Sequence, residues 1–196
     1  MRVQLTLFSA LLVLAPASAA TAMAPLSKDQ AAVVGGWSGQ GDRIGDSFSG
    51  GSPIRGLLLQ SVVDAGGCLK LGPDAVVLDN RVDMYDSRVT SLYRLKPGRY
   101  AVAGVKWAQA WFDQYDMVGL SRAKGEAWVV DLEPGVVTDI GVWPVTSPYD
   151  HRFIPGDAKP GVGSPGASEA VAGAAPLVQA KWSRAQVLDA DATCAH

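Results

Sequence analysis

Short apolar runs bounded by Gly and Pro make up most of the chain after residue 30. Residues 31–34 (AAVV) are a first candidate strand, which the following pair of glycines ends. Residues 54–63 form a stronger run, and its length and Gly/Pro borders favour a buried strand over a helix. Shorter strands are expected at residues 69–71 and 75–78, on either side of a turn at residues 72–74.

Two similar blocks follow, residues 92–105 (LYRLKPGRYAVAGV) and residues 129–142 (VVDLEPGVVTDIGV). Each block has a β-rich run, the motif Leu-x-Pro-Gly, a second β-rich run and a later Gly-Val. Proline presets φ at the second position of a turn, and glycine supplies the positive φ at the third. Each block therefore predicts strand, type II turn and strand. The joined strands either pair loosely or cross between two sheets, because type II turns fit tight hairpins poorly.

Two segments fit more than one structure. Trp107, Trp111 and Tyr115 are spaced four residues apart, so a short helix would stack them on one face. The same segment could equally be an aromatic loop that continues the preceding strand. Residues 177–188, around Trp182, fit a helix or a strand.

The N-terminus has the pattern of a secretory signal. Arg2 precedes an apolar run over residues 5–14, and small residues follow at positions 17–20. This pattern predicts cleavage after Ala19 or Ala20, and hence a periplasmic or secreted protein. A membrane span needs roughly 20 apolar residues, about twice this run, so we expect none after cleavage.

The two blocks resemble a broad group of bacterial exported domains of unknown function that have a prealbumin-like or immunoglobulin-like β-sandwich. The resemblance covers roughly residues 31–146 and rests on Leu95-Lys96-Pro97-Gly98-Arg99-Tyr100 and on the run from Pro134 to Gly141. It implies a sandwich fold and an envelope setting, and it supplies no catalytic residues. Many members are lipoproteins, whereas this chain has no cysteine near the cleavage site.

The sequence thus predicts an all-β protein, an antiparallel β-sandwich with an irregular C-terminal extension. We expect a signal peptide at 1–20, the sandwich domain at 21–150, a flexible linker rich in Pro, Gly and Ala at 151–176, and a C-terminal segment at 177–196 that can pack back on the domain.

Charge and composition narrow the function. Without Arg2 the mature chain has 16 basic residues (17 − 1) against 19 acidic ones, a net charge of −3. This balance gives no basic surface for nucleic acid and no polybasic patch for membranes. A hydrophobic share of 48% argues against a wholly disordered chain.

Cys68 and Cys194 are the two cysteines. In an oxidising compartment they are natural disulfide partners. A bridge that closes so long a loop would stabilise the fold by roughly 3–5 kcal/mol. The alternative is two unpaired thiols, one of them in a frayed tail.

Enzyme signatures are weak. The two histidines, His151 and His196, lie in a Pro-rich segment and at the last position, and no His/Cys group has zinc spacing. Asp79, Asp83 and Asp86 could offer oxygen ligands to Ca²⁺, although a solvated turn-forming loop explains them better. We therefore predict no catalytic residues, no metal and no cofactor.

The leading hypothesis is a non-catalytic envelope or secreted module, binding or structural, whose partner is an unknown envelope protein or a glycan. The aromatic residues Trp107, Trp111 and Tyr115 are the candidate ligand-binding residues, because exposed rings stack on sugars and grip peptides. Core filling is the simpler explanation for them. The alternatives are a carbohydrate- or peptide-binding domain that uses this cluster, and a hydrolase with carboxylate chemistry.

Overall fold

The computed structural model describes residues 24–40, 54–80, 91–108, 115–118, 126–146, 163–173 and 175–194. Within them the protein is mainly β, with one short helix. The strands are β1 (Ala31–Gln40), β2 (Ile54–Asp64), β3 (Leu69–Leu78), β4 (Leu92–Leu95), β5 (Gly98–Ala108), β6 (Tyr115–Val118), β7 (Glu126–Leu132), β8 (Val137–Thr146), β9 (Leu177–Gln179) and β10 (Ser183–Leu188), and the helix is α2 (Ala167–Val171). The expected signal peptide lies outside the described residues.

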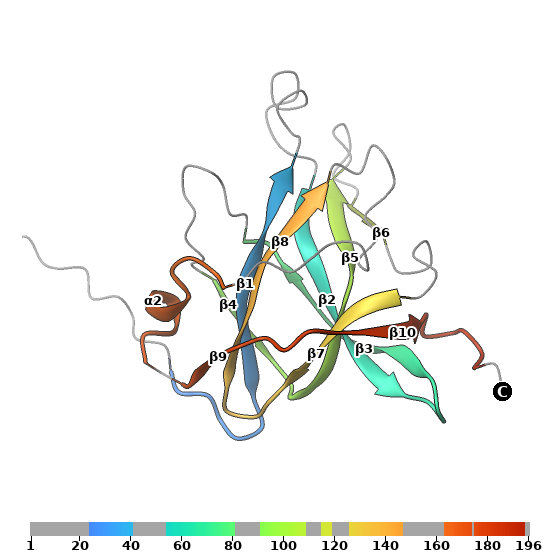
Figure 1. Cartoon of the computed structure of the whole chain (residues 1–196), viewed down its shortest axis with the longest axis horizontal. Coiled ribbons are helices and arrows are strands. Elements are labelled where there is room, and N and C mark those ends of the chain that lie inside the picture. Colours follow the sequence, from blue (N-terminus) through green and yellow to red (C-terminus); the bar gives the residue numbers. More distant parts are fainter. Residues whose placement is uncertain are drawn as a thin grey trace, which may run out of the picture.

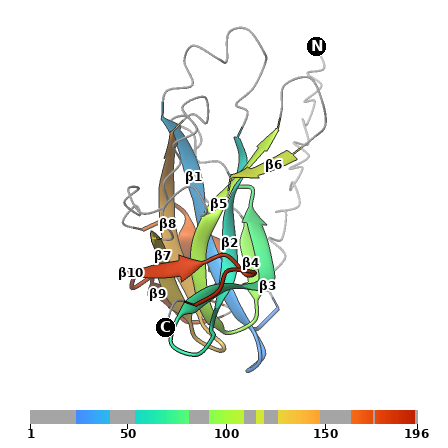
Figure 2. The same cartoon turned by 90° about the vertical axis from the view of Figure 1, so that its right-hand side faces the viewer.

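The strands form two sheets (Figure 1). The first has the order β4-β1-β8-β9, and the second has the order β2-β3-β10-β7-β5-β6. Because β2 also pairs with β5, the strands β2, β3, β10, β7 and β5 pair around a closed ring, and β6 extends it at one side. Figure 2 shows the first sheet beside this ring.

The expectation of antiparallel pairing throughout is wrong at three places. β1 and β8 are parallel, as are β8 and β9, and β3 and β10. No tight hairpin joins the two strands of any of these pairs, so they are free to lie parallel. Alternation within a strand shows which residues face inward, but it carries no information about the direction of the neighbouring strand.

Three apolar clusters hold the layers together. The largest lies between the two sheets and includes Trp37 and Trp143 from the first sheet and Leu59 from the second. A second cluster draws on every strand of the ring and on no strand of the first sheet, so it fills the ring; its buried members are Leu58, Val62, Leu71, Ala101, Ala103, Ala127, Val129 and Val187. A third covers the outer face of the first sheet, where α2 packs.

Two glycine-based expectations were wrong. β1 does not end at Gly35 but continues to Gln40, because Gly35 pairs with Gly141 and its missing Cβ leaves room for Ile140. Residues 72–74 do not form a turn between two strands. They are an irregular stretch inside the continuous strand β3, where Gln60 Nε2 donates to the Gly72 carbonyl and Ser61 Oγ accepts from the Asp74 amide.

Both Pro-Gly motifs connect strands, and both connections cross between sheets. Pro97-Gly98 leads from β4 in the first sheet to β5 in the second, and Pro134-Gly135 leads from β7 back to β8. The second is a hydrogen-bonded turn with Gly135 at φ 74°, whereas Gly98 has φ 144°. Of the two open possibilities, the crossing between sheets is therefore the one found.

The C-terminal segment forms part of both sheets. β9 pairs with β8, and β10 lies between β3 and β7, so residues 177–188 are strands rather than a helix. Cys68 and Cys194 form a disulfide with a Cα–Cα distance of 6.0 Å, which confirms the geometry expected for the pair. Trp182 packs edge-on against Trp143, with ring centroids 5.0 Å apart.

Part of the range expected to be a linker is packed. α2 lies on the outer face of the first sheet, with Ala167 and Val171 buried. Its small and β-branched side chains fill the space above Ala32 and Val34. Composition predicts a flexible segment here, because small side chains bury little apolar area by themselves. They pack only where another surface lies close, and composition does not reveal that surface.

Candidate functional site

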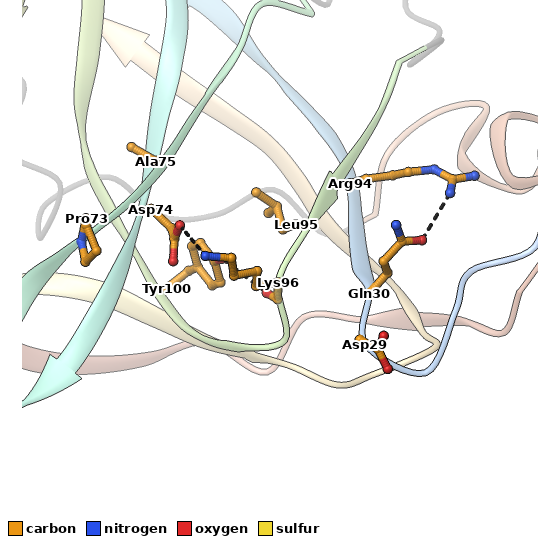
Figure 3. Close-up of a pocket in the computed structure, with 9 residues that line it drawn as sticks. All are labelled: Asp29, Gln30, Pro73, Asp74, Ala75, Arg94, Leu95, Lys96 and Tyr100. Atoms are coloured by element: carbon orange, nitrogen blue, oxygen red, sulfur yellow. Dashed lines mark hydrogen bonds and ion pairs between the residues drawn. The ribbon is translucent and has the colours of Figure 1, made fainter.

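A polar hollow of about 460 Å³ lies where the first sheet meets the ring. Its walls come from the segment before β1, the irregular stretch of β3, the end of β4 and the start of β5 (Figure 3). The lining residues are Asp29, Gln30, Pro73, Asp74, Ala75, Arg94, Leu95, Lys96 and Tyr100. The irregularity of β3 and the crossing at Pro97-Gly98 thus bring charged residues from separate segments to one place.

The charged groups lie on two sides of Leu95. On one side Lys96 Nζ is 2.9 Å from Asp74 Oδ1; the Lys96 side chain is largely exposed and the Asp74 side chain is partly exposed. On the other side Arg94 donates to Gln30 Oε1 at 3.1 Å and to the Ala24 carbonyl at 2.6 Å. Both of these acceptors are neutral, so the Arg94 hydrogen bonds orient its guanidinium without cancelling the charge.

Tyr100 forms the floor of the hollow and closes the turn before β5. Its ring is 1% exposed, and its hydroxyl donates to the Lys96 carbonyl at 3.1 Å. Burial, and secondly the negative charge of Asp74, raise the pKa of the Tyr100 hydroxyl. The hydroxyl therefore stays neutral and occupied by its backbone bond at physiological pH.

The lining of the hollow is polar and charged. It offers the carboxylates of Asp29 and Asp74, the cationic groups of Arg94 and Lys96, and the amide of Gln30. Such groups can orient a polar ligand.

A second polar cluster surrounds Asp139 of β8, which is 3% exposed. Its carboxylate accepts from the Gly141 amide, from the amide and hydroxyl of Ser164, and from Gln179 Nε2 at 2.6 Å. These donors come from β8 itself, the segment before α2, and β9. The cluster fastens the C-terminal segment to the first sheet.

The structure describes two of the three predicted aromatic residues, and it places them in paired strands. Trp107 lies in β5 and Tyr115 begins β6, with Trp107 opposite Asp116, so the helix that would stack them is wrong and a strand pair replaces it. The alternative, in which the segment continues the preceding strand, holds for Trp107. Trp111 lies outside the described residues.

Most of the other candidate residues lie where the structure describes nothing. Asp83, Asp86, His151 and His196 lie outside the described residues, and Asp79 instead hydrogen-bonds with Tyr93. In the described part of the chain, no cluster of His, Cys, Asp and Glu could hold a metal ion. The helices of that same part include none long and apolar enough to cross a membrane.

No protein-family model, curated protein or solved structure matches this chain.

The residues of the hollow and Asp139 were not predicted from the sequence. Lys96 and Tyr100 appear in the Leu-x-Pro-Gly-x-Tyr motif, but only as turn chemistry. The one available signal for the part of the hollow formed by β3 was Gly72-Pro73-Asp74. A Gly-Pro-Asp run between two apolar stretches is typical of an irregular strand as well as of a turn.

Proposed function

We propose that this chain is an exported, non-catalytic binding module with a β-sandwich fold, and that the polar hollow is its binding site. The two facing sheets with a shared core support the sandwich, as does the bond from the Tyr100 hydroxyl to the Lys96 backbone, a contact typical of tyrosine corners in sandwich domains. The disulfide supports export, because such bonds persist in oxidising compartments.

The single observation that carries the binding proposal is the arrangement of charge around Leu95. On one side lies a cation hydrogen-bonded to neutral partners, with Asp29 also in the lining there, and on the other side lies an ion pair. A peptide of an envelope protein can match this arrangement with its backbone amides and with side chains of both signs. A glycan matches it less well, because the aromatic ring in the lining, Tyr100, is buried and offers no face for stacking.

The binding test is a titration of the mature chain with mixed-charge peptides and neutral oligosaccharides, followed by amide chemical shifts. We expect peptides to shift amides around Arg94–Lys96, and the double variant Arg94→Ala, Lys96→Ala to weaken binding at least tenfold, about 1.4 kcal/mol. Arg99→Ala is the matched control, because Arg99 is an exposed cation paired with Asp131 outside the hollow. Equal losses in both variants, or shifts elsewhere, would contradict the proposal.

Export is tested separately. Protein recovered from the periplasm or medium should begin at Ala20 or Thr21, since we expect cleavage after Ala19 or Ala20. Intact mass measures this directly. Exported protein that still carries Met1 would overturn the export proposal without affecting the binding site.

A further inference from the structure

The ring of the second sheet depends on a strand from the far end of the chain. β10 pairs with β7 through residues 183–186 and with β3 through Val187 and Leu188 (Figures 1 and 2). Without β10, β7 and β3 would each present an unpaired edge, and the ring would be open between them. An open edge of this kind is a template for another extended strand.

The slot between β3 and β7 recognises a particular strand. Val187 is 0% exposed and inserts into the apolar filling of the ring, against which Ala185 also packs. The Arg184 guanidinium lies 5.0 Å from the centre of the Trp128 ring. The slot therefore selects its strand in two ways: by backbone pairing, and by the apolar side chain that the strand must present at position 187.

The disulfide lies at the end of this slot. Cys68 directly precedes β3, Cys194 follows β10, and both are partly exposed. Cys194 Sγ also lies 3.2 Å from the Ala65 carbonyl. The covalent bond that holds β10 in place is thus within reach of a small thiol.

We propose that β10 can leave its own slot and fill the slot of a second copy of this chain, giving a strand-exchanged dimer joined by Cys68–Cys194 bonds between copies. The occupant is a second copy because its strand carries the matching pair, Val187 for the ring and Cys194 for Cys68. The exchange needs no new contact, since each interface in the dimer is one that the single chain already makes.

The bond exchange is balanced. A small thiolate attacks Cys194 Sγ, forms a mixed disulfide with it and releases the Cys68 thiolate. Once the strand lies in the second copy, that copy's Cys68 thiolate attacks the same Cys194 Sγ and expels the small thiolate. The number of disulfides is unchanged and the thiol is regenerated, so no oxidant is consumed.

The test mixes two full mature chains, Cys68→Ser and isotopically heavy Cys194→Ser, in a glutathione redox buffer. Each variant lacks one partner, so a Cys68–Cys194 bond can form only between copies. Random thiol oxidation would give about half heterodimer, whereas strand exchange predicts that nearly all the disulfide-linked dimer is the heterodimer. Mass spectrometry of non-reduced digests identifies the linked peptides.

The controls concern register position 187. Adding Val187→Lys to the Cys68→Ser chain should return the heterodimer to the random share, while Gln186→Lys, the same charge at an exposed position opposite Glu126, should leave it high. To avoid reliance on variant folding, an excess of a synthetic peptide of residues 181–196 with Cys194 replaced by Ser should suppress the heterodimer. The same peptide with Lys at 187 should not. A random heterodimer share in the parent mixture, or equal suppression by both peptides, would overturn the proposal.

Discussion

The buried carboxylate of Asp139 holds the C-terminal segment to the first sheet through donors from three segments of the chain. Asp139→Ala would leave the buried amides of Gly141 and Ser164 without an acceptor. Since an unsatisfied buried donor costs about 1–3 kcal/mol, we expect a loss of about 2–4 kcal/mol in the free energy of unfolding, measured by urea denaturation.

Asp131→Ala is the matched control. Asp131 also accepts hydrogen bonds, from Arg99 at 2.9 Å, but its side chain is 69% exposed. An exposed ion pair contributes about 0–1 kcal/mol, so this variant should retain nearly all its stability. A loss for Asp139→Ala no larger than that for Asp131→Ala would contradict the role assigned to Asp139.

Tyr93 makes the stability of the fold sensitive to alkaline pH. Its hydroxyl donates to Asp79 and accepts from the Asp79 and Asn80 amides. Burial, and secondly the hydrogen bond with Asp79, raise the pKa of Tyr93 from 10.0 to about 12. Between these values the unfolded chain releases the proton and the folded chain keeps it, so stability is lost as pH rises.

The measurement compares urea midpoints of the wild type and Tyr93→Phe from about pH 9 to about pH 11.5. We expect the wild type to lose more stability over this range, because the variant has no hydroxyl at that position to titrate. Both proteins share every other titrating residue, so the difference in slope isolates Tyr93. Parallel curves would show that Tyr93 ionises alike in the folded and unfolded chain.

At the residue scale, the sequence predicted those features that depend on few candidates or on neighbouring residues alone. The Cys68–Cys194 pair follows from there being two cysteines, and Gly135 from the geometry of a turn. Asp139 and the residues of the hollow depend on partners far along the chain. A polar residue in an apolar run does not reveal whether its donors are water or another segment.

At the scale of elements, the crossing turns allow a direct comparison of two glycines. Neither Gly98 nor Gly135 has an atom within 4 Å of where a Cβ would stand, so alanine at either position meets no steric contact. Its cost comes from the positive φ alone, and we expect about 1 kcal/mol for each variant. Thermal melts measure the loss, with the exposed neighbour Glu133→Ala as control.

The strands themselves were largely predictable, whereas their ends were not. The apolar runs predicted as strands between residues 31 and 142 all lie in strands, because alternation and Gly/Pro borders are local signals. β1 and β3 are longer than expected. Each strand continues past glycines that suggest a break in the sequence, because it stays paired with a neighbouring strand there. The segment after Trp107 was ambiguous for the same reason: aromatic residues at a spacing of four fit a helix until β6 pairs with β5.

At the scale of the molecule, the disulfide and β10 act together, and reduction should reveal this. A bond that closes a loop across a sequence separation of 126 residues stabilises the fold by roughly 3–5 kcal/mol. On reduction we expect a lower melting temperature and trypsin cleavage first at Lys181 and Arg184, while the first sheet persists. Limited proteolysis with mass analysis tests the order, and Cys68→Ser with Cys194→Ser should behave like the reduced protein under non-reducing conditions.

The topology of the ring also governs when the protein can fold. Its last strand begins at Ser183, more than a hundred residues after the β3 strand with which it pairs, and β1 pairs with β8 across a similar separation. Contacts between such distant segments raise the relative contact order and slow folding, because the loop entropy is lost before the contacts form. A growing chain that still lacks residues 183–188 cannot pair β3 with β7 through β10, so the ring stays open until these residues have left the ribosome.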